Sequence, residues 1–464
     1  MEKQESAVKF IRIFVAIAVL ALAGKASGQT VTIIYQFGGG NAFPNNLIQG
    51  SDGNFYGTTY LDGTANDGAV FRMTPGGILT NLYSFTGLSG DGDGAYPWAG
   101  LIQAKDGNFY GTTSDGGLGN GTVFRISPAG KLTNFYLFGS TRYGGGIPIA
   151  PLAQGTDGNF YGTTDKGGTS GHGAIFRISP SGVYTTLYSF AGPPTDGGNP
   201  AAGLVQGTDG NFYGTTQGGQ SAGAVFRISP AGNYTNLHTF LGYGDGGDPV
   251  AGLVEGTNGS LYGTTLGGTV YEITPSGTLT VLYSVIVSNL DGPQAPLVLA
   301  SDGNFYGTTY SGGTSTNCPG CGTIFRVSPS GVITTIYNFA GTPNDGSLPE
   351  AAIVQGSDGN LYGTTEGGGT NGYGTIFRLS VPLNPPANQI SSTLVDSSGT
   401  NVVFSIPSVA GETYQLQFSP SMNPTNWSNV AGVCVSNSIG AALTVTNFGG
   451  ATGPQGFYRF AITP

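Results

Sequence analysis

An eight-residue pattern, D-G-N-F-Y-G-T-T with small variations, occurs seven times along the chain. The copies begin at Asp52, Asp106, Asp157, Asp209, Asn258, Asp302 and Asp358. The period is therefore about fifty residues, which is the size of one supersecondary unit in a repeat architecture. Such self-similarity constrains the fold more than any local pattern does.

Each repeat contains four short runs rich in β-branched and aromatic residues. In the second repeat they cover 99–103, 108–113, 122–127 and 132–138, with Asp-Gly and Pro-x-Gly turns between some of them. Four antiparallel strands make one propeller blade, so the sequence predicts an all-β, seven-bladed β-propeller. The 84 glycines and 27 prolines fit this interpretation, because most of the glycines fall at fixed turn positions of the repeat.

The two ends of the repeat array complement each other. The last repeat stops after its third run, at 375–380, and a run of the fourth kind stands before the first repeat, at 31–37. We expect this N-terminal strand to become the outer strand of the last blade and to close the ring, because closure protects strand edges. The propeller is predicted to cover residues 29–380.

Residues 1–28 have the pattern of a secretory signal peptide. Lys9 and Arg12 precede an apolar run over 13–22, and small residues at 26–28 offer a cleavage site. The run is shorter than the roughly twenty residues of a membrane span; an uncleaved anchor is the alternative. We expect a mature protein that is secreted, periplasmic or on the cell surface, with no membrane span after cleavage.

Cleavage removes four basic and two acidic residues, which leaves the mature chain with a net charge of −12. No basic patch remains, and this argues against a nucleic-acid partner.

The repeat pattern ends at a Pro-rich linker over 381–389. The remainder, 390–464, alternates like strands, and a small β-sandwich accessory domain with Trp427 in its core is predicted.

The chain has three cysteines, two of them close together in one long loop of the sixth repeat. In an exported protein, a disulfide between Cys318 and Cys321 is the favoured interpretation. A zinc site needs about four ligands, and no other Cys or His pair is present; a thioredoxin-like redox role lacks its βαβ context. Cys434 is left without a partner and is interpreted as a small buried hydrophobe.

The repeats resemble those of the choice-of-anchor tandem repeat GloVer-containing bacterial proteins. The motifs that carry this resemblance are D-G-N-F-Y-G-T-T, a following G-G, V-F-R-I-S-P-x-G and L-Y-S-F, over residues 31–380. The resemblance implies an exported propeller, often with a variable C-terminal module for surface attachment. The C-terminal segment, with A-G-E-T-Y-Q-L-Q and a terminal F-Y-R, is similar to accessory domains of secreted verrucomicrobial proteins. A looser likeness to sensor-type propellers adds support for the fold alone.

Residues that recur in every repeat are needed by every blade and are poor candidates for a single active site. One position holds arginine in six repeats and Glu272 in the fifth; we expect these side chains to pack between blades and to bond carbonyls or carboxylates. The Asp of D-G-N is expected to cap its own turn. His238 occupies a slot that is tyrosine in five other repeats, so it is interpreted as a packing residue.

The variable positions lie in the loops after the second and fourth strands, which we expect on one face of the ring. In successive repeats the residue after G-T-T is Tyr60, Ser114, Asp165, Gln217, Leu266, Tyr310 or Glu366. Aromatic rings beside carboxylates and amides suit sugar recognition, since a ring stacks on the apolar face of a pyranose while polar groups bond its hydroxyls. The candidate binding residues are Tyr60, Tyr96, Trp98, Tyr143, Tyr243 and Tyr310. The alternative is that these rings cover the channel mouth or each other.

The loops after the fourth strands hold four equivalent aspartates, which are Asp93, Asp196, Asp245 and Asp345. Oxygen-rich clusters suit Ca²⁺, but capping of Asp-Gly turns explains these residues without an ion and is favoured. No cofactor is otherwise predicted.

The sequence favours a monomeric binding scaffold whose ligand is an extracellular glycan or another protein. One alternative is a polysaccharide lyase or glycoside hydrolase that uses Asp165 and Glu366, and a hydrolase needs two carboxylates about 5–10 Å apart across a cleft. Such a pair beside Trp98 or Tyr310 favours the enzyme, whereas isolated carboxylates around a flat aromatic rim favour binding. A purely structural or adhesive role is the other alternative.

Overall fold

The computed structural model describes residues 30–380, apart from 40–41, 88–91, 140–144, 194, 218–221, 243 and 285–291, together with six C-terminal strands between 392 and 463. Within these residues the protein is all-β, with seven four-stranded antiparallel sheets that follow the repeats. The predicted seven-bladed propeller is confirmed. Helices do not occur in the part of the chain that the structure describes, so none there could span a lipid bilayer.

We number the blades 1 to 7 in the order of their first strands. The first strands are β2 (Ile48–Gln49), β6 (Ile102–Gln103), β10 (Ala153–Gln154), β14 (Val205–Gln206), β18 (Val254–Glu255), β22 (Val298–Leu299) and β27 (Val354–Gln355). The second strands are β3 (Phe55–Thr59), β7 (Phe109–Thr113), β11 (Phe160–Thr164), β15 (Phe212–Thr216), β19 (Leu261–Thr264), β23 (Phe305–Thr309) and β28 (Leu361–Thr365). The third strands are β4 (Ala69–Met73), β8 (Thr122–Ile126), β12 (Ala174–Ile178), β16 (Ala224–Ile228), β20 (Thr269–Ile273), β24 (Thr323–Val327) and β30 (Thr375–Ser380). The fourth strands are β5 (Leu79–Ser84), β9 (Leu132–Leu137), β13 (Tyr184–Ser189), β17 (Tyr234–Thr239), β21 (Leu279–Ser284), β25 (Ile333–Asn338) and, for blade 7, β1 (Thr30–Gln36).

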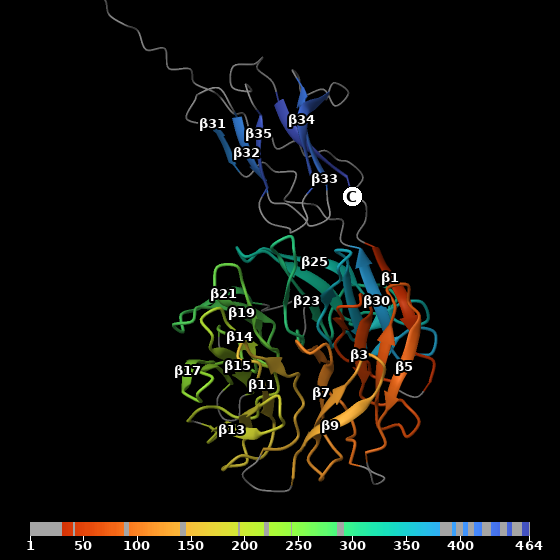
Figure 1. Cartoon of the computed structure of the whole chain (residues 1–464), viewed down its shortest axis with the longest axis vertical. Coiled ribbons are helices and arrows are strands. Elements are labelled where there is room, and N and C mark those ends of the chain that lie inside the picture. The colour runs from red at the N-terminus through yellow and green to blue at the C-terminus, as the bar shows by residue number, and fades with distance from the viewer. Residues whose placement is uncertain are drawn as a thin grey trace, which may run out of the picture.

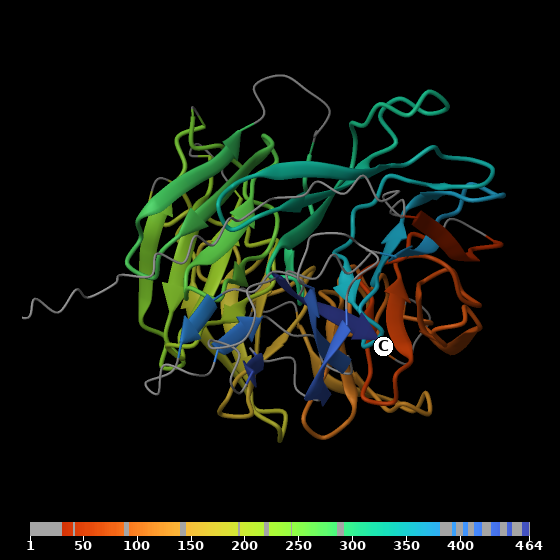
Figure 2. The same cartoon turned by 90° about the horizontal axis from the view of Figure 1, so that it is seen from above.

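The ring closes through the N-terminal strand, as predicted. β1 pairs antiparallel with β30, from Thr30 opposite Ser380 to Gln36 opposite Thr375. In Figure 1 the red strand β1 lies beside the blue strand β30, and the repeats follow one another in colour order around the ring. The view from above in Figure 2 shows the same succession. The first and last segments of the array therefore share one sheet.

The repeated octapeptide forms the turn before the second strand of each blade and allows the second and third strands to pack closely. In the second repeat, Asp106 accepts hydrogen bonds from the backbone N–H of Asn108 at 3.0 Å, from its side chain at 2.8 Å and from the Tyr110 hydroxyl at 3.0 Å. The predicted turn-capping role of this aspartate is thereby confirmed. Gly111 is required because a Cβ there would lie 2.5 Å from the Phe124 ring on the third strand.

The same residues join neighbouring blades. Tyr56 of blade 1 stacks on Phe109 of blade 2 with ring centroids 3.9 Å apart, and the Gln103 side chain of blade 2 accepts a hydrogen bond from the Ser51 amide of blade 1 at 2.8 Å. Equivalent side-chain bonds link blades 2 to 3, 3 to 4, 4 to 5, 6 to 7 and 7 to 1, through Gln154, Gln206, Glu255, Gln355 and Gln49. We call these bonds the blade clasps. Blade 6 carries Leu299 at the corresponding position, and a leucine side chain cannot accept a hydrogen bond.

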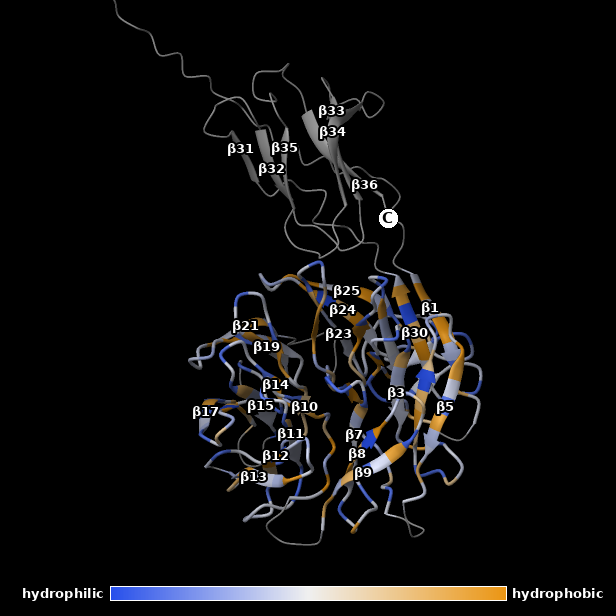
Figure 3. Cartoon of the chain, in the orientation of Figure 1, coloured by the Kyte–Doolittle hydropathy of each residue, from blue (hydrophilic) through white to orange (hydrophobic). Residues whose placement is uncertain are grey.

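The hydrophobic core is distributed between blades. One buried cluster combines Tyr56, Val70 and Phe85 of blade 1 with Phe109 and Phe124 of blade 2, and similar clusters occur around the ring. Figure 3 shows hydrophobic and hydrophilic segments alternating along strands such as β30. Each interface depends on apolar side chains of both blades, so a blade contributes stability through its neighbours.

The first strands are shorter than predicted. The run over 99–103 yields only two paired residues, Ile102–Gln103. The preceding residues form a loop instead, because Pro97 lacks an N–H group and Ala99 is bonded through its carbonyl to the neighbouring blade.

The C-terminal segment contains two three-stranded sheets. One has the order β31 (Ser392–Val395), β32 (Val402–Ile406), β35 (Leu443–Asn447), and the other has the order β34 (Ser428–Ser436), β33 (Thr413–Ser419), β36 (Phe457–Thr463). Six strands fit the predicted sandwich, but its side-chain packing, Trp427 and the linker over 381–389 lie outside the described residues. Residues 1–28, with the predicted signal peptide, lie outside them as well.

Candidate functional site

Seven loops of one conformation, each leading into a first strand, converge inside the ring. Every one contains a proline, and the residue before it has a positive φ between 45° and 69°. These residues are Phe43, Tyr96, Ile147, Asn199, Asp248, Gly292 and Leu348. We call the segments the inner loops. Left-handed φ angles are uncommon for bulky residues, so the surrounding structure must hold this backbone in place.

Two hydrogen bonds hold each inner loop. In blade 2, the carbonyl of Ala99 accepts a bond from Thr58 Oγ1 of blade 1 at 2.9 Å, and the carbonyl of Tyr96 accepts a bond from the Ser114 amide at 3.1 Å. Thr58 belongs to the G-T-T of its repeat, and Ser114 is the residue after G-T-T. In blade 7 the carbonyl of Ala351 accepts from Thr308 Oγ1 at 3.3 Å. The repeat-invariant threonine thus positions a loop of the next blade.

The inner loops enclose a central cavity of about 520 Å³. In all seven blades, the residue after the inner-loop proline lines it. These post-proline residues are Asn45, Trp98, Ile149, Ala201, Val250, Gln294 and Glu350. The cavity falls within the range of about 300–1,000 Å³ that is usual for small-molecule sites. The position varies although the proline before it is invariant and the residue after it is alanine in six of the seven repeats, which is expected of a recognition surface on a rigid scaffold.

The chemistry of the lining differs between the two sides of the ring. At the post-proline positions, blades 3, 4 and 5 contribute Ile149, Ala201 and Val250, which form an apolar arc to which Gln217 of blade 4 adds one amide. Blades 6, 7, 1 and 2 contribute amide, carboxylate and aromatic groups, in the order Gln294, Glu350, Asn45, Trp98. An asymmetric lining of this kind orients a ligand that has one apolar and one polar side.

Trp98 is the most prominent aromatic residue of the lining. Its side chain is 46% exposed, and Tyr60 of blade 1 contacts its ring edge-on with centroids 4.6 Å apart. Tyr60 also packs on Tyr96 at 5.2 Å. Three of the candidate binding residues therefore form one group, in which Tyr60 fixes an exposed indole ring. Burial, followed by the charge of Asp67, raises the pKa of the Tyr96 phenol.

The acidic group of the lining comes from blade 7. Glu366, a sequence candidate, lines the cavity together with Glu350, and Tyr310 of blade 6 hydrogen-bonds the Glu366 carboxylate. Glu350 is open to water inside the cavity, yet the surrounding protein, and next the charge of Glu366, raise the pKa of its carboxyl. Burial and then the charge and hydrogen bond of Glu366 raise the pKa of Tyr310 to about 12.

Glu350 was not among the site residues predicted from the sequence. One feature of the sequence could have indicated it. The residue directly after the repeat-invariant proline varies between repeats, and Trp98 occupies this position in the second repeat. Glu350 and Glu366 come together because the two variable positions of a blade are linked through the inner loop, where the Glu366 amide bonds the Leu348 carbonyl at 3.0 Å.

The other sequence candidates lie elsewhere. The Asp165 carboxylate of blade 3 pairs with Lys166 at 3.1 Å and accepts a bond from Asn199 at 3.2 Å. Asp165 does not line the cavity. The carboxylate that lies near Glu366 there is that of Glu350. Tyr143 and Tyr243 lie outside the described residues.

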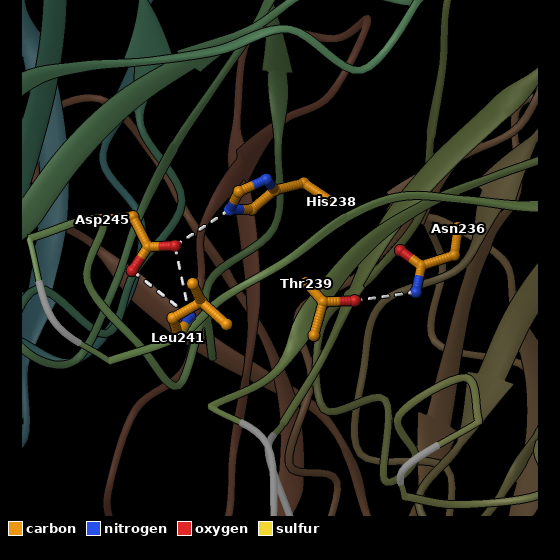
Figure 4. A network of polar contacts seen from close by, with 5 residues as sticks. All are labelled: Asn236, His238, Thr239, Leu241 and Asp245. Carbon is orange, nitrogen blue, oxygen red and sulfur yellow. Dashed lines mark hydrogen bonds and ion pairs between the residues drawn. The ribbon is translucent and has the colours of Figure 1, made fainter.

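The four candidate calcium ligands lie in four different blades, and each is bonded within its own loop. Asp93, Asp196 and Asp345 accept hydrogen bonds from fourth-strand tyrosine hydroxyls at 2.9, 2.6 and 2.8 Å and from nearby backbone amides. After the fourth strand of blade 4, the partner of Asp245 is His238 at 3.1 Å (Figure 4). This arrangement matches turn capping. In the described residues, no three His, Cys, Asp or Glu side chains gather as metal ligands.

His238 packs as predicted, with its ring edge-on to Phe240 at 5.0 Å. Its bond to Asp245 shows why tyrosine is common in this slot: the slot needs a polar tip as well as a ring. Cys318 and Cys321 are joined by a disulfide in the loop of blade 6, where both sulfurs lie next to Gly341 of the loop that follows the fourth strand. The bridge therefore packs against that second loop.

Comparison with known proteins supports the repeat assignment. The model of the Gloeobacter/Verrucomicrobia repeat matches residues 24–222 and 209–401. A search of the curated proteins found no match. Among solved structures, the extracellular domain of a protein assigned as a hybrid two-component system from B. thetaiotaomicron is 11% identical, with a TM-score of 0.51, over 91% of this chain and 56% of that one. A gluconolactonase from Xanthomonas campestris is 12% identical, with a TM-score of 0.41, over 78% of this chain and 93% of that one. At such identities the likeness to the first structure concerns the fold alone, and the likeness to the second is weaker still.

Proposed function

Because this chain belongs to the Gloeobacter/Verrucomicrobia repeat family, whose repeats build the entire ring, we propose that it is a secreted or cell-surface binding propeller. Its ligand is an extracellular saccharide, held in the central cavity. The C-terminal segment over 390–464 is an accessory β-sandwich, and residues 1–28 are a signal peptide that is cleaved on export.

The observation that carries this proposal is the composition of the seven post-proline positions. Trp98 offers an exposed ring for the apolar face of a pyranose, while Asn45, Gln294 and Glu350 offer donors and acceptors for its hydroxyls. The backbone beneath them has the same conformation and hydrogen bonds in each blade, so the loops that carry the site are formed without a ligand. Preorganisation of this kind reduces the entropic cost of binding.

A panel of immobilised glycans, probed with purified mature protein, tests the proposal. Binding that weakens in Trp98→Ala, with the melting temperature retained, supports a saccharide site in the cavity. Binding to none of the glycans, or equal binding by the Trp98 variant, contradicts it. Ser114→Ala is the matched control, because its hydroxyl bonds the Tyr96 carbonyl at 2.9 Å and does not line the cavity.

A glycoside hydrolase is the second candidate, favoured by one observation. Two carboxylates, Glu350 and Glu366, line the same cavity as Trp98, and Tyr310 holds one of them. The raised pKa of Glu350 suits a general acid, and the Glu366 carboxyl beside it would serve as the base or nucleophile. Release of reducing ends from a bound glycan, lost in both Glu350→Gln and Glu366→Gln, supports hydrolysis. Retention of an intact glycan over many hours supports binding alone.

A further inference from the structure

The central cavity carries negative charge and no positive charge. Its charged lining residues are Glu350 and Glu366, and neither lysine, arginine nor histidine is among the described residues that line it. The remaining lining groups are apolar side chains, amides and the Trp98 ring. A ligand therefore meets two carboxylates on one side of the ring and a mainly apolar surface, with the Gln217 amide, on the other.

We infer that the cavity selects a saccharide with a free ammonium group, such as a hexosamine unit that lacks its N-acetyl group. This inference rests on the saccharide-binding function proposed above and names the class of sugar that the site prefers.

The fold brings the two carboxylates together. The inner-loop bond between the Glu366 amide and the Leu348 carbonyl places both variable positions of blade 7 at the cavity, and Tyr310 fixes Glu366 from the neighbouring blade. Burial by the surrounding protein, and next the repulsion from Glu366, raise the pKa of Glu350. An ammonium group between them removes this repulsion and donates charge-assisted hydrogen bonds to both.

A sugar fits the whole lining better than a bare cation does. An inorganic ion leaves the exposed ring of Trp98 and the arc of Ile149, Ala201 and Val250 without contacts. An amino sugar uses all three features, because its ring face stacks on the indole, its ammonium group meets the carboxylates and its apolar edge meets the arc. Anionic sugars such as uronates are repelled by the carboxylates and by the net negative charge of the chain.

Isothermal titration of the full mature chain at pH 6.5, with EDTA present, tests this inference. The probes are a glucosamine hexamer, its fully N-acetylated counterpart, a glucose hexamer and a galacturonate hexamer. We expect the glucosamine hexamer to bind about tenfold more tightly than the N-acetylated one, and the galacturonate hexamer to bind most weakly. The preference should shrink as salt rises, because it arises from charge.

Four variants test whether the acidic pair causes this preference. Glu366→Gln and Glu350→Gln should each reduce the tenfold preference to less than about threefold. Asp165→Asn is the matched control, because it occupies the same repeat position as Glu366 but pairs with Lys166 outside the cavity; it should keep the preference. Trp98→Ala should weaken all the hexamers in similar proportion and leave their order unchanged.

The outcomes separate this inference from the proposed function. Equal binding of the glucosamine and N-acetylated hexamers, with both weakened by Trp98→Ala, overturns the inference and leaves saccharide binding in place. A preference that survives in both glutamate variants also overturns it. Absence of binding to every saccharide overturns the inference together with the proposed function.

Discussion

Tyr362 of blade 7 packs on Phe55 of blade 1, with ring centroids 4.2 Å apart and the ring planes tilted by 38°. The contact repeats the one between Tyr56 and Phe109 inside the array, at 3.9 Å. The seam at which the chain begins and ends its circuit therefore has the same packing as the interior interfaces. Ring closure depends on this contact and on the sheet that β1 shares with β30.

Deleting residues 29–38 should lower the melting temperature sharply. The deletion removes the outer strand of blade 7, which exposes the edge of β30 and uncovers apolar residues such as Phe377. Calorimetry of the deletion variant and the intact mature chain measures the effect. An unchanged melting temperature would show that β1 does not hold the ring closed.

The missing clasp between blades 5 and 6 should make that interface the weakest. Leu299 cannot accept a hydrogen bond from the Thr257 amide, so this amide should exchange with deuterium faster than the equivalent Ser51 and Ser301 amides, which glutamines bind at 2.8 Å. Gln103→Leu should speed exchange at Ser51 and cost about 1 kcal/mol. Equal protection at all three amides in the native protein would contradict this prediction.

In the fifth repeat, Asn258 and Glu272 replace the aspartate and the arginine of the other repeats. We expect the usual pair to be tolerated there only when both residues are changed together. Asn258 donates to Glu272 at 3.0 Å, where other repeats hold an aspartate near an arginine. Asn258→Asp alone places two carboxylates side by side, and Glu272→Arg alone removes the acceptor, so each should destabilise the protein. The double variant should recover about 1 kcal/mol of coupling in chemical unfolding. Additive effects would mean that the two residues do not interact.

Trp98→Ala and Tyr136→Ala should separate binding from stability. Loss of the Trp98 ring should weaken a bound saccharide about tenfold or more, by analogy with the roughly 1–3 kcal/mol of base stacking on aromatic residues. Tyr136 stacks on Tyr184 of the next blade at 4.4 Å, so its loss should mainly lower the melting temperature. The reverse pattern, with Tyr136→Ala impairing affinity and leaving stability intact, would argue against a site in the cavity.

The turn aspartates should make the ring sensitive to acid. Burial opposes ionisation of Asp209, but hydrogen bonds from the Asn211 side chain, the Tyr213 phenol and the Asn211 amide lower its pKa overall. A lowered folded-state pKa gives stability that is complete above the unfolded value of about 3.9 and is lost as the pH falls through the lower folded value. Asp209→Asn should cost about 1 kcal/mol at pH 7, and thermal melts should show this cost shrinking below pH 4. A cost independent of pH would exclude the carboxylate as its source.

The propeller architecture could be predicted because the sequence contains seven copies of one repeat, and each copy forms one blade. The octapeptide, the turn aspartates and the complementary ends each predict a contact that the structure contains, such as the pairing of Thr30 with Ser380. These features depend on local geometry and on strand order, both of which a repeat makes visible. The packing of the C-terminal sheets has no such internal copies and stays a prediction.

The composition of the site was harder to predict. Asp165 and Glu366 share a repeat position but lie in blades 3 and 7, so sequence equivalence separates them in space. Glu350 meets Glu366 because of the inner-loop conformation, in which Leu348 has a φ of 57°. Sequence patterns do not predict a left-handed leucine, since side chains with a Cβ seldom adopt it. The partnership of the two glutamates therefore required the three-dimensional structure.

A substitution at one post-proline position changes the cavity lining and leaves the frame of the inner loops intact. The proline, the residue before it and the threonine of the preceding blade set the backbone, and none of them depends on which side chain follows the proline. Selection can therefore alter what such a ring recognises one residue at a time, with little loss of stability at each step. The seven loops make ligand preference an evolvable property that is largely independent of folding.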